Sequence, residues 1–153
     1  MLRFEGNHGR SVEVEGLSVE KILDKLGIQK GPIAATLNGK NLDLSAVPDE
    51  GGHIEPIWPE SLEGLDILRH STAHLMAQAV EKLFPGTRFG IGPSIEEGFY
   101  YDMDVPEKIS EEDLTRIENE MRKLVKQAIP IERVEMSREQ AIEFFRQRND
   151  PYK

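Results

Sequence analysis

The sequence contains no cysteine among its 153 residues, which excludes disulfide bonds and thiolate metal sites within the chain. It also has no run approaching the ~18 consecutive apolar residues that a membrane-spanning helix needs. Residues 1–5 do not form the apolar core of a signal peptide. From these absences we expect a soluble, cytoplasmic protein without a membrane partner.

An excess of basic residues is also absent, since the formal net charge is −9. Residues 1–60 carry 6 Lys and Arg against 10 Asp and Glu, and the remainder carries 13 against 18. Neither half therefore has the basic surface that binds nucleic acid through its phosphates. No GxxxxGK[ST] loop occurs, and Gly90-x-Gly92-Pro93 does not fit a dinucleotide fingerprint. We expect no nucleotide site in this chain and only local contacts with any RNA.

The first 60 residues have the pattern of a small α+β domain. Residues 2–5 and 11–15 alternate between apolar and polar around a glycine-rich turn, which predicts a hairpin. Ser18 and Gly27 bracket an apolar helical stripe as candidate caps. Strands are predicted at residues 33–37, which end in the turn Asn38-Gly39, and at 53–57, with a short strand or turn around Leu42 and Leu44. This order is that of a β-grasp (ubiquitin-like) fold, in which the helix covers one face of a mixed sheet.

Residues 62–153 follow a junction marked by Pro56, Trp58, Pro59 and Gly64, with Trp58 expected to pack between domains. We predict helices at 62–84, 110–128 and 137–148, and strands at 88–93, 98–103 and 131–136. Ser110 with Asp113, and Ser137 with Gln140, form capping boxes for the second and third helices. The predicted buried stripe of the second helix is Leu114, Ile117, Met121, Leu124 and Val125. The abrupt end after Lys153 suggests an incomplete α+β domain. The predicted boundaries are thus 1–60 and 62–153.

His70 and His74 are the residues most able to carry chemistry. They lie four apart in a predicted helix, so their Cβ atoms should be roughly 5–6 Å apart on one face. They could be joint metal ligands, a general base with its partner, or two solvent-facing side chains. Ser71 occupies the place of the glutamate in the metalloprotease signature HExxH, and a zinc site would need further ligands, none of which is identifiable here. The spacing alone leaves these alternatives open.

Four segments together resemble the N-terminal region of bacterial threonyl-tRNA synthetases, and the resemblance extends over the whole chain. They are Arg69-His70-Ser71-Thr72-Ala73-His74-Leu75, Gly90-Ile91-Gly92-Pro93, Gly98-Phe99-Tyr100-Tyr101-Asp102 and Tyr152-Lys153. The resemblance implies a TGS domain, a β-grasp module, at residues 1–60. It implies the first part of a tRNA editing domain at residues 62–153.

The resemblance also implies an activity: a threonine–tRNA ligase that proofreads its own product. A threonine-binding site rejects serine only through one methyl group, worth about 1–3 kcal/mol, so a second site must hydrolyse seryl-tRNA. By similarity, His70, His74 and Lys153 would be catalytic, and Gly92 and Tyr100 would lie near the pocket wall. No metal ligand is implied. The family completes this pocket with an Asp-x-Cys and a Cys-x-x-x-His segment that this chain does not contain.

The resemblance also implies which cofactors and partners belong to this chain and which belong to the full-length enzyme. We expect no cofactor in this chain, because ATP, Mg and Zn belong to the aminoacylation domain, which is absent here. The implied partners are tRNA and, for the full-length enzyme, a second copy in a homodimer. The isolated chain is expected neither to aminoacylate nor to deacylate efficiently. Two alternatives remain: a free-standing regulatory or tRNA-docking module that contains a TGS domain, and a metal-dependent deacylase whose partner supplies ligands.

Overall fold

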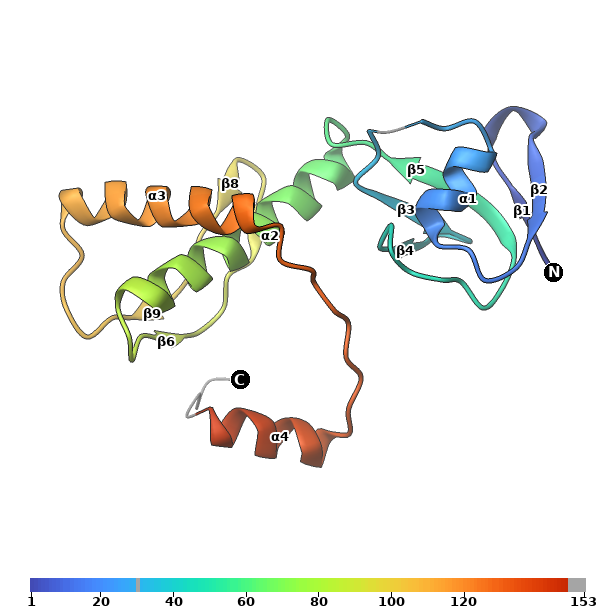
Figure 1. Ribbon diagram of the computed structural model, residues 1–153. Helices are drawn as coiled ribbons and strands as arrows, with labels where there is room; N and C mark the ends of the chain where they lie inside the picture. Colours follow the sequence, from blue (N-terminus) through green and yellow to red (C-terminus); the bar gives the residue numbers. More distant parts are fainter. Residues whose placement is uncertain (30, 149–153) are drawn as a thin grey trace. The chain divides into compact units, whose positions relative to one another are not determined.

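The computed structural model describes residues 1–29 and 31–148, and the chain forms two compact units, Met1–Leu68 and Arg69–Lys153. Figure 1 shows the elements in chain order. The elements that begin in the first unit are β1 (Leu2–Glu5), the short 3-10 helix η1 (Asn7–Gly9), β2 (Ser11–Val14), α1 (Val19–Lys25), β3 (Ala34–Leu37), β4 (Lys40–Leu42), β5 (Gly52–Ile57) and α2 (Leu62–Leu83), which continues into the second unit. The elements that follow are β6 (Arg88–Phe89), β7 (Ser94–Ile95), β8 (Gly98–Phe99), β9 (Met103–Asp104), α3 (Glu111–Gln127) and α4 (Arg138–Gln147). The predicted α+β class is confirmed.

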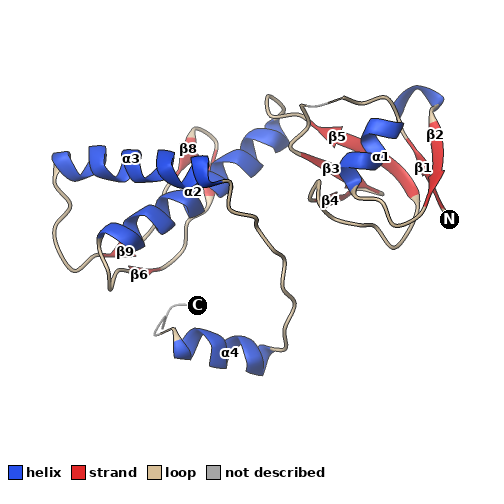
Figure 2. Ribbon diagram, in the orientation of Figure 1, coloured by secondary structure: helices blue, strands red, loops and turns tan. Residues whose placement is uncertain are grey.

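The first unit is a five-stranded mixed sheet with the strand order β2-β1-β5-β3-β4. Strands β1 and β5 pair in parallel, and the other neighbours are antiparallel. Helix α1 lies across one face of this sheet (Figure 2). The connection between the two parallel strands therefore carries the helix and the β3–β4 hairpin.

The core of the first unit joins α1 to the covered face of the sheet. Val19, Ile22, Leu23 and Leu26 recur at helical spacing, and all four are at most 2% exposed. They pack against four buried strand residues, Phe4, Ala35, Leu37 and Ile54. Gly27 ends the helix with a φ of 83°, as predicted. Ser18 occupies the N-cap position, but its side chain makes no capping hydrogen bond.

The turn between β3 and β4 follows from its sequence. Asn38 and Gly39 both have positive φ, 51° and 79°, as a two-residue hairpin turn of the primed type requires. The Asn38 side chain also accepts a hydrogen bond from the backbone N–H of His53 at 3.0 Å and donates to the carbonyl of Gly51 at 3.2 Å. The turn residue therefore also holds the start of β5.

In the second unit, α2 and α3 form the framework. Helix α2 buries a face of small side chains, Ala73, Ala77 and Val80, which allows a close approach of neighbouring elements. Ile117 of α3 is buried in the same core, together with Phe84 and Phe89. Across the two helices, Lys82 donates to Glu120 at 2.5 Å, and Glu120 is only 5% exposed. This hydrogen bond from Lys82 is the main reason that the pKa of Glu120 is below its ordinary value.

Both predicted capping boxes are confirmed. Ser110 caps α3 by accepting from the backbone N–H of Asp113, and Asp113 accepts in return from the Ser110 backbone N–H. This backbone hydrogen bond is the largest cause that lowers the pKa of Asp113. Ser137 and Gln140 make the same exchange at the start of α4. The two helices therefore begin where side chains satisfy their first N–H groups.

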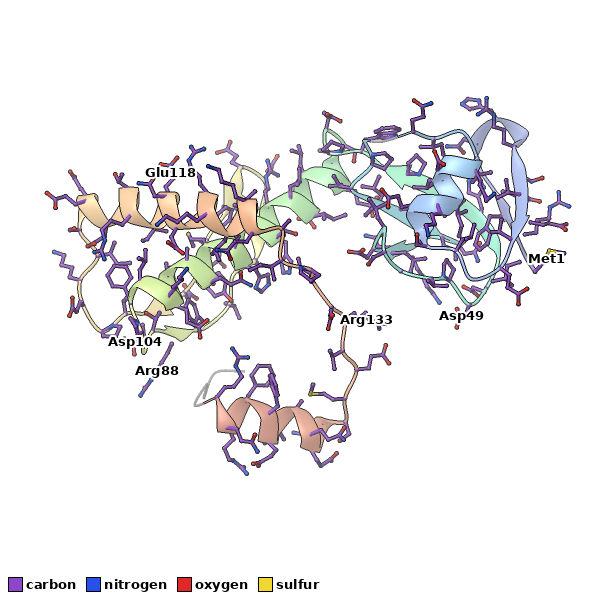
Figure 3. The ribbon with its side chains drawn as sticks, viewed as in Figure 1. Met1, Asp49, Arg88, Asp104, Glu118 and Arg133 are labelled. Atoms are coloured by element: carbon purple, nitrogen blue, oxygen red, sulfur yellow. The ribbon has the colours of Figure 1, made fainter. Side chains whose placement is uncertain are left out.

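Two predictions about this region are wrong. Residues 131–136 form no strand, and all six are exposed; no strand among residues 1–29 and 31–148 pairs with them, and a strand is stable only with a partner. Arg133 extends from this segment in Figure 3. The predicted buried stripe of α3 is only partly buried, since Leu114 and Val125 are 60% and 62% exposed. Ile117 is the member of the stripe that is buried, and Met121 and Leu124 are partly buried against the same core. Glu118 lies on the side of α3 that faces away from α2 (Figure 3).

The predicted strands around residues 88–103 are shorter than expected. They form two small antiparallel pairs, β6 with β9 and β7 with β8. Arg88 and Asp104, labelled in Figure 3, are opposite one another in the first pair. In the described part of the chain, no helix is both long enough and apolar enough to cross a membrane.

Candidate functional site

His70 and His74 lie on one exposed face of α2, and their rings are in contact. Their Nε2 atoms are 3.2 Å apart, and their ring centroids are 4.6 Å apart with the planes at 75°. A hydrogen bond at this distance requires one Nε2 to donate and the other to accept, and the tautomers decide which does which. The helix produces this geometry directly, because residues i and i+4 are neighbours on its surface. Two imidazole nitrogens therefore converge on one small volume beside α2.

A groove of about 590 Å³ opens beside the pair. Its polar side comes from α2 and consists of His70, Ser71, His74 and Gln78. Its apolar side comes mainly from the end of α3 and the residues after it, and consists of Leu75, Leu124, Val125, Ala128, Ile129, Pro130 and Ile131. Ala128 ends α3 with a φ of 47°, so the chain turns here toward the apolar side of the groove. A polar group bound between the imidazoles would thus face an aliphatic surface.

On the other side of His74 lies the ring of Tyr101. The two rings meet edge to face, with centroids 6.1 Å apart, and Tyr101 packs in the same manner on Phe89 at 5.7 Å. These three residues contribute to a second groove of about 340 Å³, which also contacts Gln78 and Arg88. His74 therefore lies between two grooves, and an aromatic ring supports it from one side.

Gly92 makes the position of Tyr101 possible. A Cβ atom at Gly92 would lie 2.3 Å from Cδ2 and 2.5 Å from Cε2 of that ring, which is far closer than van der Waals contact. The neighbouring backbone is fixed by two hydrogen bonds, from the N–H of Gly90 to the carbonyl of Asp102 and from the N–H of Asp102 to the carbonyl of Ile91, each 2.9 Å. The absence of a side chain at Gly92 therefore lets the ring of Tyr101 pack directly against the backbone.

The structure brings some of the predicted site residues together. The rings of His70 and His74 are in contact. Gly92 lies under the ring of Tyr101, and that ring in turn contacts His74. Tyr100 is 47% exposed, and it is its neighbour Tyr101 that lies against His74. Lys153, the third predicted catalytic residue, lies outside the described residues. Tyr101 was not among the predicted site residues, although it belongs to the segment Gly98-Phe99-Tyr100-Tyr101-Asp102 that carries the family resemblance.

Acidic side chains do not complete a metal centre around the pair. Among residues 1–29 and 31–148, no group of three or more His, Asp or Glu side chains is placed to hold one metal ion. The carboxylate of Glu120, at the α2–α3 contact, is already engaged by Lys82 and by Lys123 at 3.3 Å. The carboxylate of Glu120 is therefore held at the contact between α2 and α3 and does not join the two imidazoles.

No protein-family model matches the chain. Among curated proteins, it is 46% identical over 99% of its length to a threonine–tRNA ligase of Carboxydothermus hydrogenoformans, and 43% identical over 95% to one of Rubrobacter xylanophilus. It is 51% identical over 83% of its length to one of Listeria welshimeri. The matches cover 24%, 23% and 20% of these relatives, so the chain spans about a quarter of their length at most.

This similarity relates the chain to the aminoacyl-tRNA synthetases as a class, because the relatives are tRNA ligases. Within that class all three are threonine–tRNA ligases, so the resemblance of this chain to threonyl-tRNA synthetases is confirmed.

Proposed function

We propose that the chain is the N-terminal region of a threonine–tRNA ligase and contributes to hydrolysis of mischarged seryl-tRNA. In this proposal the first unit is a TGS module with the β-grasp fold, which its strand order and covering helix support. The second unit is the first part of the editing domain. The observation that carries the proposal is the convergence of two imidazole nitrogens at 3.2 Å beside a groove.

The chemistry required is attack by water on the ester between serine and the terminal ribose of tRNA. A water that enters between the imidazoles of His70 and His74 replaces their mutual hydrogen bond. One imidazole accepts a proton from the water as the water oxygen attacks the ester carbonyl, and the resulting imidazolium gives that proton to the ribose oxygen as the ester C–O bond breaks. The other imidazole holds the water or the ribose by a hydrogen bond. Imidazole suits both roles because it changes protonation near neutral pH. Lys153 is proposed as the third catalytic group on the family resemblance alone.

The groove supplies the remaining requirement, which is space for the aminoacyl end of a tRNA. Its aliphatic wall at Leu124, Val125 and Ile129 offers a surface that excludes water from one side of the ester. The acidic balance of the chain means that contact with tRNA phosphates must come from basic surfaces elsewhere in a longer protein. The ATP-dependent ligation, the tRNA partner and the homodimer are proposed for that longer protein.

Because the isolated chain is expected to hydrolyse slowly, the sharpest test measures binding. A seryl-adenosine analogue in which an amide replaces the ester would be titrated into the full chain while the imidazole resonances are followed by NMR. We expect the signals of His70 and His74 to shift and those of His8 and His53 to stay in place. Shifts confined to the first unit, or none, would contradict the proposal and favour the docking-module alternative.

A kinetic experiment tests the roles of the histidines separately. We expect seryl-tRNA to be deacylated slowly by the chain, and His70→Ala and His74→Ala each to reduce that rate by the factor of about 10²–10⁴ typical of general acid–base groups. His53→Ala, in the first unit, is the matched control. Equal rates for the chain and both site variants would rule out a catalytic role of the pair.

A further inference from the structure

We propose that Asn38 is a site of spontaneous deamidation and that the fold of the first unit controls the rate of this modification. Asparagine is one of the chemically labile residues of proteins. Asn38 is followed by Gly39, and no other asparagine of the sequence is followed by glycine. Both residues are exposed in the turn that joins β3 to β4. The modification involves neither histidine of α2, so it goes beyond the proposed function and does not rest on it.

The reaction joins two groups that are neighbours in the chain. The backbone nitrogen of Gly39 attacks Cγ of the Asn38 side chain, and the proton that this nitrogen gives up leaves with the side-chain nitrogen as ammonia. Water then opens the succinimide ring at one of its two carbonyl groups, which gives either aspartate or isoaspartate. Glycine favours the attack because it has no Cβ to crowd the nitrogen and because its backbone is free to close the ring.

In the folded protein the Asn38 side chain is already engaged. Its Nδ2 donates to the carbonyl of Gly51 at 3.2 Å, and its Oδ1 accepts from the backbone N–H of His53 at 3.0 Å. It also lies against Gly52, since a Cβ there would be 2.5 Å from Nδ2 and 2.6 Å from Cγ. Cγ must swing toward Gly39 to close the ring, so the side chain must first leave the start of β5. Two hydrogen bonds of ordinary net strength lower the released population by a factor of about 5–160.

The product cannot restore the same contacts. An aspartate still accepts from the N–H of His53, but it has no donor for the carbonyl of Gly51 and turns a second oxygen toward it. An isoaspartate lengthens the main chain of a tight hairpin turn by a methylene group, which disturbs the pairing of β3 with β4. Gly52 and His53 also pair with Phe4 and Glu5 of β1, so the modification weakens the parallel contact of β1 with β5.

The first test follows deamidation of the full chain in mildly alkaline buffer, with mass spectrometry of its peptides to locate the exchange of an amino for a hydroxyl group. We expect the modification at Asn38, about 5–160-fold slower in the folded chain than in guanidinium chloride. Asn41, which precedes the bulky Leu42, should change little in either state. In the unfolded chain, Gly39→Ala should remove most of the reaction at Asn38. Equal rates in the folded and unfolded chain, or at the two asparagines, would overturn the proposal.

A second test displaces the side chain of Asn38 without changing the sequence of the turn. In Gly52→Ala the added Cβ would overlap the Asn38 amide, so deamidation of the folded chain should approach the unfolded rate. Gly16→Ala is the matched control and should leave the rate unchanged, because Gly16 also has a positive φ, 63°, and a Cβ there meets no atom within 4 Å. A folded Gly52→Ala chain that reacts no faster than the unmodified chain would contradict the proposal.

A third test measures the consequence and does not depend on the folding of Gly52→Ala. Asn38→Asp, the aspartate product, should lower the folding equilibrium constant of the first unit by about 2–13-fold, the value of one hydrogen bond. Asn41→Asp adds the same charge in the neighbouring strand and should have a smaller effect. Urea unfolding followed at the amide of Ile54, a fully buried residue of β5, provides the measurement. An equal effect of the two substitutions would overturn the role of the Asn38 amide.

Discussion

The contact between Gly92 and Tyr101 gives the sharpest structural prediction. In Gly92→Ala, the added Cβ would lie 2.3 Å from Cδ2 and 2.8 Å from Cγ of the Tyr101 ring, where ordinary contacts begin near 3.4 Å. The ring must therefore move by about an ångström, and forced overpacking of this kind costs about 1–3 kcal/mol. The move also weakens the edge contacts of Tyr101 with Phe89 and His74, which are worth about 0.5–1.5 kcal/mol each in aromatic pairs.

The same substitution also has a smaller, stabilising effect on the unfolding free energy. Replacing glycine by alanine restricts the unfolded chain and stabilises a protein by about 0.4–1 kcal/mol when the native backbone accepts it. We therefore expect a net loss of about 2 kcal/mol in the unfolding free energy of the second unit. If the ring is first removed by Tyr101→Ala, the clash disappears and Gly92→Ala should be neutral or slightly stabilising. The double-mutant cycle isolates this one contact.

The assay must follow the second unit alone, because a chain of two units need not unfold in one step. Urea unfolding monitored by NMR at the amide of Val80, a fully buried residue of α2, meets this requirement. Gly98→Ala is the matched control, since a Cβ there has no atom within 4 Å. The reasoning is refuted if Gly92→Ala costs the same with and without the tyrosine ring, or if Gly98→Ala costs as much.

Three further predictions concern stability. Lys82 lowers the pKa of Glu120 in the folded state, so their interaction stabilises the protein above the ordinary carboxyl pKa and is lost as the pH falls through the lowered pKa. In Glu120→Gln, the unfolding free energy of the second unit should therefore depend less on pH between about pH 6 and pH 2, as measured by urea unfolding. Ser110→Ala removes the cap of α3 and should cost about 1 kcal/mol, with faster amide exchange in its first turn and no change in α4. Gly39→Ala places a side chain at a φ of 79° and should cost about 1–2 kcal/mol, detected as a lower melting temperature of the first unit, whereas Gly98→Ala should leave it unchanged.

Local signals in the sequence were sufficient for most features that one segment determines by itself, although the side chain of Ser18 makes no capping hydrogen bond. The turn at Asn38 and Gly39, the end of α1 at Gly27 and the capping boxes at Ser110 and Ser137 all depend on residues within a few positions of one another. The contact between His70 and His74 is of the same kind, because the pitch of one helix fixes it. These features were therefore predictable without tertiary information.

Features that depend on distant partners were predicted less well. Residues 131–136 were predicted to form a strand, but a strand also needs a neighbour, and none pairs with them in the described residues. The choice between Tyr100 and Tyr101 depends on the hydrogen bonds that join Asp102 to Gly90 and Ile91. The sequence pattern does not predict which residues these hydrogen bonds pair. The apolar wall of the groove likewise exists only because the end of α3 lies beside the histidine face of α2.

The location of the pair on a helix has a functional consequence of its own. Ala73 and Ala77, which flank His74 by one and three positions, are buried, and this packed face fixes the rotation of α2 about its axis. The imidazoles therefore start from a backbone that is ordered before any ligand arrives, and binding need not pay to order a loop. Tyr101 adds a second constraint by limiting the side-chain rotations of His74. Such an arrangement favours a small ligand, such as a water molecule, that fits between the two nitrogens. Because Gly92→Ala displaces the ring of Tyr101 from His74, this variant should weaken binding of the seryl-adenosine analogue, measured by the same NMR titration.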